Sequence, residues 1–140
     1  MSEAKPKSAG QSKRPMSPFM IGPYYKPQLT SMLSITHRIM GVGLAVGSFL
    51  LAWWFYAVAA GPESYATFLG CADTLVGRVI LAGFMFAAIY HTLNGIRHLL
   101  WDIGWGFEIE KVYASGYVMA TLAALGTLAA WYCAFFRGDA

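Results

Sequence analysis

Three long stretches of this chain contain no acidic residue, lysine or arginine. They cover residues 39–62, 79–96 and 112–136, which are 24, 18 and 25 residues long. A helix needs about 20 mostly apolar residues to cross the roughly 30 Å hydrocarbon core of a bilayer. Because lipid offers no hydrogen-bond partners, a spanning segment must be a helix or a strand of a closed barrel, and these runs lack the two-residue alternation of barrel strands. The pattern predicts an all-α membrane protein with three transmembrane helices.

Proline, glycine and polar residues set the expected boundaries. The helices are predicted over about residues 31–60, 75–101 and 113–136. Residues 61–73 are expected to form a loop, with a short interfacial turn as an option. Residues 1–30 are predicted to be a basic arm rich in Pro and Ser, and residues 31–140 a three-helix anchor domain that a partner subunit completes into a bundle.

Composition narrows the class of protein further. The chain is 57% hydrophobic and 12% charged, whereas soluble domains are about 25% charged. These values exclude an ordinary soluble domain, a disordered chain and a disulfide scaffold. Too few residues lie outside the apolar segments to build a self-contained enzyme with its own substrate domain.

The basic residues predict the orientation. Five of the ten Lys and Arg residues precede residue 32. By the positive-inside rule, the N-terminus is expected inside and the C-terminus outside. The arm is expected to be extended, lying against another protein or against anionic lipid headgroups. Its charge gives no reason to invoke nucleic acid.

The two cysteines, Cys71 and Cys133, are too few for an iron–sulfur cluster or a zinc site. Both are expected near the outer face. A disulfide between them is conceivable, but two ordinary thiols are favoured.

Polar residues inside the spans are costly, so each needs a reason. They form two groups, one at the start of the first helix and one toward the end of the second: Ser34, His37 and Arg38; His91, Arg97 and His98. Within each group the spacing of three, four or seven residues brings side chains to one face. At 1.5 Å per residue both groups lie roughly 10–14 Å inside antiparallel helices, on the inner side. They are therefore expected to converge.

A histidine at this depth with a glycine one turn away, as in His91 and Gly95, suits haem: the imidazole binds iron, and the missing side chain leaves room for the porphyrin. The other four cationic side chains could pair with the haem propionates; these are His37, Arg38, Arg97 and His98. Ser34 and Arg38 could instead hydrogen-bond a quinone carbonyl. The alternative to both is a structural role, with histidines joining helices and arginines reaching to the surface. A six-coordinate haem needs His37 or a partner chain as its second ligand, and the shallow position of His37 favours the partner.

Three motifs in this order carry a family resemblance. They are Arg14-Pro15-Met16-Ser17-Pro18, Ser34-x2-His37-Arg38, and His91-x3-Gly95-Ile96-Arg97-His98-x3-Asp102. The chain resembles the cytochrome b556 family of succinate dehydrogenase, the larger of its two membrane anchor subunits. The resemblance implies that His91 is an axial ligand of haem b, that Ser34 and Arg38 belong to the ubiquinone site, and that His37, Arg38 and His98 lie near the propionates.

The same resemblance implies the partners and the place of the protein. A histidine of the smaller anchor subunit would supply the second haem ligand, and the quinone site would also involve the iron–sulfur subunit. Succinate oxidation would belong to the flavoprotein subunit, since this chain has neither a dinucleotide fingerprint nor a cysteine cluster. Alternatives are the anchor of a quinol:fumarate reductase and a cofactor-free membrane scaffold. A bacterial inner membrane is expected, with a mitochondrial inner membrane as the alternative.

Overall fold

The computed structural model describes residues 26–136 of the chain. The elements of this part are four helices and no strand: α1 (Leu29–Ala60), α2 (Pro62–Ala72), α3 (Leu75–Asp102) and α4 (Ile109–Phe136). Three of them, α1, α3 and α4, are long and apolar enough to cross a membrane. The prediction of an all-α protein with three transmembrane helices is therefore confirmed. Most of the expected basic arm lies outside the described residues.

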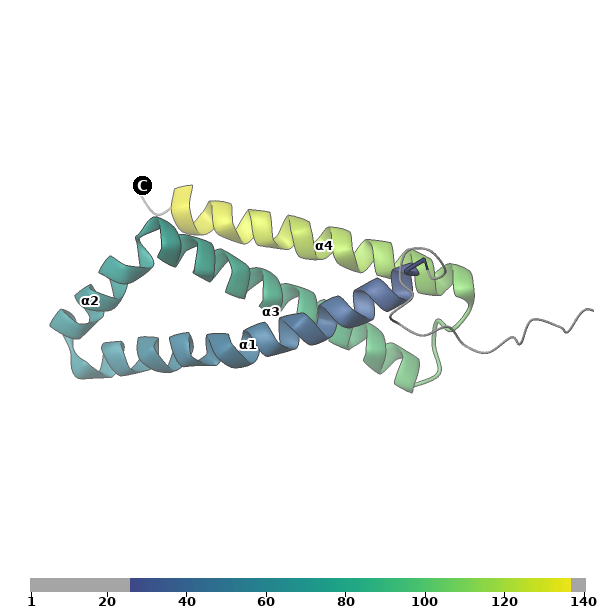
Figure 1. Ribbon diagram of the computed structural model, residues 1–140, viewed down its shortest axis with the longest axis horizontal. Coiled ribbons are helices and arrows are strands. Elements are labelled where there is room, and N and C mark those ends of the chain that lie inside the picture. The colour runs from purple at the N-terminus through teal and green to yellow at the C-terminus, as the bar shows by residue number, and fades with distance from the viewer. Residues whose placement is uncertain (1–25, 137–140) are drawn as a thin grey trace, which may run out of the picture.

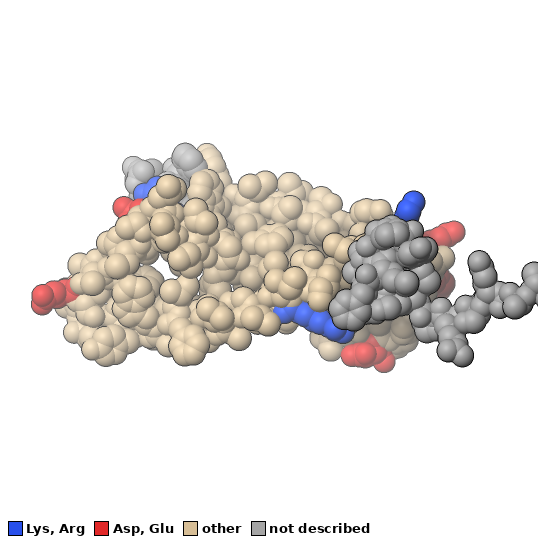
Figure 2. Space-filling model, in the orientation of Figure 1, with Lys and Arg blue, Asp and Glu red and all other residues tan. Residues whose placement is uncertain are grey.

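The three long helices run in alternating directions along one elongated body (Figure 1). The start of α1 lies at the same end as the connection from α3 to α4, and α2 lies at the opposite end. On the face shown in Figure 2, charged side chains lie at one end and in the half of the body toward the other end, and the stretch between them is uncharged. This distribution is the one expected of a body whose middle lies in lipid.

The first and last long helices begin earlier than their hydrophobicity suggests. The Gln28 carbonyl accepts from the Met32 N–H at 3.0 Å, and the Glu108 carbonyl accepts from the Val112 N–H at 2.9 Å. These bonds start α1 two residues and α4 four residues before the expected positions. The apolar run marks only the part of a helix that lies in lipid, whereas the hydrogen-bond ladder continues into the polar flank.

The expectation of a loop over residues 61–73 is wrong, because most of that segment is helix α2. Gly61 has φ 108°, a left-handed conformation that favours glycine, and it ends α1. Pro62 then occupies the first turn of the new helix, where its missing N–H is harmless. The Phe68 ring packs edge-on against Trp53 of α1, with ring centres 4.9 Å apart. This apolar contact holds the short helix against α1.

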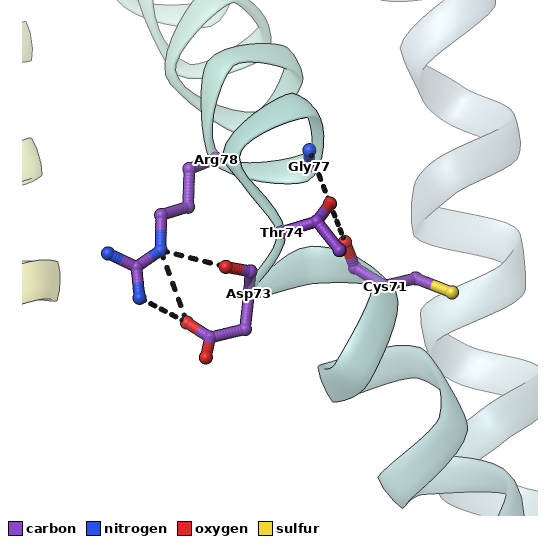
Figure 3. Close-up of polar contacts among 5 residues, drawn as sticks. All are labelled: Cys71, Asp73, Thr74, Gly77 and Arg78. Carbon is purple, nitrogen blue, oxygen red and sulfur yellow. Dashed lines mark hydrogen bonds and ion pairs between the residues drawn. The ribbon is translucent and has the colours of Figure 1, made fainter.

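The corner between α2 and α3 is fixed by side-chain hydrogen bonds (Figure 3). The Thr74 hydroxyl donates to the Cys71 carbonyl at 2.7 Å and accepts from the Gly77 N–H at 3.0 Å, which caps α3. Arg78 forms an ion pair with Asp73 at 2.5 Å. The thiol of Cys71 points away from this pair. Both Cys71 and Cys133 are free thiols in the structure, as favoured from the sequence.

The buried core lies toward the α3–α4 connection, where α1, α3 and α4 meet. Its buried members come from all three helices: Leu33, Tyr90, Met119 and Ala123. Farther along α1, Gly47 admits the Phe84 ring of α3 so closely that a Cβ at Gly47 would overlap the ring. Gly43, one turn earlier, has open space around its missing Cβ. Only one of these two glycines is therefore needed for the approach of α1 to α3.

We expect Gly47→Ala to destabilise the subunit, because its methyl group overlaps the Phe84 ring. Overpacking of this kind typically costs about 1–3 kcal/mol. Thermal unfolding of the purified assembly, followed by loss of intact complex, should show a lower midpoint. Gly43→Ala is the matched control and should leave the midpoint unchanged. Phe84→Ala should relieve part of the Gly47→Ala effect; equal harm from both glycine variants would contradict this account.

Candidate functional site

Three histidine rings from α1 and α3 pack face to face. The His37 ring lies 3.9 Å from the His91 ring, at an interplanar angle of 13°. It also lies 5.4 Å from the His98 ring, at an angle of 20°. His91 and His98 are two turns apart on α3, so one ring of α1 contacts both of them. The predicted convergence of the two polar groups is confirmed for these histidines.

Backbone carbonyls fix which nitrogen of each α3 histidine carries hydrogen. The His91 Nδ1 lies 3.3 Å from the His37 carbonyl, and the His98 Nδ1 lies 2.8 Å from the Asn94 carbonyl. A carbonyl oxygen only accepts, so each Nδ1 is the donor in these contacts, and in the neutral ring the lone pair is then on Nε2. An Nε2 lone pair with Nδ1 held by a backbone carbonyl is the usual arrangement of a metal-binding histidine.

The surroundings of His91 fit a haem ligand. A Cβ at Gly41 would lie 3.1 Å from His91 Cε1, so glycine allows the imidazole to approach α1. Gly95, one turn beyond His91, has open space where a side chain would stand. The Nδ1 of His37 is buried and has no hydrogen-bond partner within the described part of the chain. The oriented His91 imidazole, the open space at Gly95 and the unpartnered ring nitrogen of His37 are compatible with a haem and its propionates.

Ser34 and Arg38 lie on α1 one turn apart, on either side of His37 in the sequence. Ser34 is half-buried, and Arg38 is exposed. Within residues 26–136, Arg38 has neither a hydrogen bond nor an ion pair. A hydroxyl and a free guanidinium on one helical face are both available to a ligand.

Arg97 faces a different neighbour from the histidines. Its Nε donates to the Ser115 hydroxyl of α4 at 3.0 Å, and its Nη2 donates to the Val112 carbonyl at 2.8 Å. The guanidinium carbon lies 4.1 Å from the centre of the Trp101 ring. Only 6% of the residue is exposed. The sequence grouped Arg97 with His91 and His98, whereas the structure brings only the two histidines to His37.

Sequence reasoning missed the polar residues that surround Arg97. Tyr90 donates from its hydroxyl to the Leu33 carbonyl of α1 at 3.1 Å, and Asn94 is completely buried. The spacing of Tyr90, Asn94 and Arg97 is i, i+4 and i+7, which puts them on one face of α3. The sequence contains this spacing, but the same spacing, shifted by one residue, relates His91, Gly95 and His98. From the sequence, only the face with the histidines was assigned a role.

The connection between α3 and α4 carries exposed charges. Lys111 donates a hydrogen bond to the Glu108 carboxylate at 3.0 Å. This bond holds the pKa of Glu108 below its ordinary value, because it stabilises the ionised form. An exposed ion pair between Glu108 and Lys111 therefore lies where the connection enters α4, at the end of the molecule that is closest to the histidines.

Comparisons with known proteins found one matching family and several similar proteins. Residues 11–130 match the family described as succinate dehydrogenase/fumarate reductase transmembrane subunit. A succinate dehydrogenase cytochrome b556 subunit of Rickettsia bellii is 40% identical over 127 residues, covering 91% of this chain and 98% of the relative. The subunit of the same name from Paracoccus denitrificans is 39% identical over 109 residues, covering 75% and 79%. The mitochondrial cytochrome b560 subunit of Mus musculus is 38% identical over 121 residues, covering 83% and 69%.

Proposed function

Because this chain belongs to the succinate dehydrogenase/fumarate reductase transmembrane subunit family, we propose that it anchors a succinate dehydrogenase in the membrane, binds haem b and forms part of a ubiquinone site. The His91 ring carries this proposal. It lies inside a membrane-spanning helix, its Nδ1 is directed at a backbone carbonyl, and its Nε2 is left with a lone pair. A neutral imidazole held in this way is prepared to bind iron.

Haem b, when bound, supplies a one-electron carrier within the membrane. The residues of this chain then have separate tasks. His91 would hold the iron, and the His37 carbonyl, which accepts from His91 Nδ1, would orient the ring for it. His37 and His98 lie face to face beside it. We assign His37 Nδ1 and the Arg38 guanidinium to the propionates as donors, and His98 joins them when its ring is protonated, so that Nε2 also carries hydrogen.

A second histidine that would help hold the haem is assigned to the smaller anchor subunit. The His37 and His91 rings are nearly parallel, with centres 3.9 Å apart. Because these two rings stack face on face, they would not both direct a nitrogen at one haem iron. The packing of His37 on His91 therefore favours a ligand from the partner over His37.

Ser34 and Arg38 are assigned to the quinone. Both donate hydrogen bonds, and a quinone offers two carbonyl oxygens as acceptors. As the quinone is reduced, negative charge develops on these oxygens, and a nearby guanidinium stabilises it. Arg38 is exposed, and within the described residues it has no ionic partner, as this task requires. Its place on α1 beside His37 puts the quinone close to the haem residues.

The assembly follows from the same assignment. Flavoprotein and iron–sulfur subunits would oxidise succinate and deliver electrons, and the iron–sulfur subunit would dock at the end of the molecule where α1 begins. With the N-terminus inside, that end faces the cytoplasm of a bacterium, or the matrix in a mitochondrial setting. The exposed apolar surface of the long helices contacts lipid and the smaller anchor.

The test of this function is the isolated complex. Purified through a tag on this chain, it should contain three further subunits and show a b-type reduced-minus-oxidised spectrum. It should also reduce ubiquinone with electrons from succinate. Faster fumarate reduction with menaquinol would identify a quinol:fumarate reductase instead. A fully assembled complex without a haem spectrum would support the alternative of a cofactor-free membrane scaffold.

A further inference from the structure

Arg97 is a charged side chain enclosed by three helices. Within the described residues it has no acidic partner, and its hydrogen bonds go to the hydroxyl of Ser115 and the carbonyl of Val112. Ser115 in turn donates to the same Val112 carbonyl at 3.1 Å. An arginine inside a membrane-spanning bundle is expensive. Two of its donors are hydrogen-bonded to α4, which indicates that Arg97 has a role in joining α3 to α4.

The hydrogen bonds of Arg97 continue toward the histidines. Its Nη1 donates to the Asn94 side-chain oxygen at 3.4 Å. The backbone carbonyl of Asn94 accepts from His98 Nδ1 at 2.8 Å. Asn94 is fully buried, and its Nδ2 has no partner within residues 26–136. One chain of polar contacts thus runs from Ser115 on α4 through Arg97 to the residue that orients His98.

The rotation of α3 about its own axis decides where its histidines point. Successive residues of a helix are about 100° apart, so His98 is about 100° around α3 from Arg97. When Arg97 is held by α4, His91 and His98 are turned toward α1. On α4, a Cβ at Gly116 would lie 2.8 Å from Leu33 Cδ1 and 3.6 Å from Arg97 Nη2. The absence of a side chain there lets α1, α3 and α4 meet at the guanidinium.

We propose that Arg97 is a positioning residue for the haem site: by binding Ser115 and the Val112 carbonyl it fixes the rotation of α3 and so directs His91 and His98 at His37. This role differs from direct contact with a propionate, and it rests on the proposed function for its spectroscopic readout. The guanidinium influences the haem site by fixing the rotation of α3. Its positive charge does not act on the haem directly.

Two variants separate rotation from charge. Ser115→Ala keeps the Arg97 charge and removes one acceptor, whereas Arg97→Lys keeps a charge and loses the planar donor set. In the purified complex, both should shift the haem midpoint potential and the low-temperature spectrum of the ligated iron in the same direction. The shift should be larger for Arg97→Lys. Arg97→Gln should give the largest shift. If the complex with Arg97→Gln does not assemble, Ser115→Ala and Arg97→Lys test the positioning role.

Arg78→Gln is the matched control, since Arg78 is the arginine near the other end of α3 and is paired with exposed Asp73. It should leave the haem signals unchanged. A haem signature that is unchanged in both Ser115→Ala and Arg97→Lys overturns the positioning role, even where stability falls. A shift in Arg97→Gln alone would mean that the charge acts directly, and it would overturn the role too. A wild-type complex without haem would instead overturn the proposed function.

Discussion

His91→Ala is expected to abolish or reorganise the b-type spectrum of the complex. The variant removes the His91 imidazole, and the other two histidines are placed differently: His37 stacks on the ring that is lost, and His98 lies two turns away. The reduced-minus-oxidised spectrum, normalised to subunit content, measures the effect. We expect more than half of the haem absorbance to be lost.

Thr92→Ala is the control for this variant, because Thr92 is the next residue on α3 and is exposed. It should retain the full spectrum. An unchanged spectrum in His91→Ala would show that His91 is not the ligand. His37→Ala adds a further distinction: we expect haem to remain, with altered bands, whereas complete loss would make His37 the second ligand.

Arg38→Ala is expected to reduce ubiquinone reduction by about 10- to 100-fold. A hydrogen bond from a charged group contributes about 1.5–3 kcal/mol, and each 1.4 kcal/mol is a factor of about ten in rate or affinity. Succinate oxidation with an artificial dye should persist, because that reaction does not pass through the quinone site. Arg38→Lys should recover part of the activity, since it restores the charge but not the planar fork of donors.

The ratio of the two activities is the decisive measurement for Arg38. Lys111→Ala, at the exposed ion pair with Glu108 in the first turn of α4, serves as the control and should preserve both activities. Equal loss of quinone and dye reduction in Arg38→Ala would point to failed assembly. Full quinone reduction would remove Arg38 from the site.

The meeting of the histidines was predictable from simple geometry. His37 stands near the start of one span, and His91 and His98 stand near the end of the next. Antiparallel helices with a fixed rise per residue bring such positions to the same depth. The face-to-face packing of the rings was not predictable, because it depends on side-chain rotamers and on the small distance that Gly41 allows.

The errors at the edges of the spans have a related cause. Hydropathy detects only the segment whose side chains lie in lipid, so the polar first turn of α4 escaped it. The apolar residues of α2 form too short a run to span, and Phe68 finds its partner, Trp53, only after the chain has turned at Gly61. A segment that is stabilised by a distant contact gives a weak local signal.

The sequence by itself determined that this chain crosses a membrane three times and that its few intramembrane polar residues form two groups on successive helices. Solvation dictates that result, since lipid accepts neither charge nor an unsatisfied backbone. Only the tertiary structure decided which side of α3 faces which neighbour. Helical periodicity gives angles between residues of one helix, but not the rotation of that helix in its bundle. That rotation comes from contacts between helices, such as Arg97 with Ser115 and Leu33 against Gly116, and it separates Arg97 from the histidines beside it in the sequence.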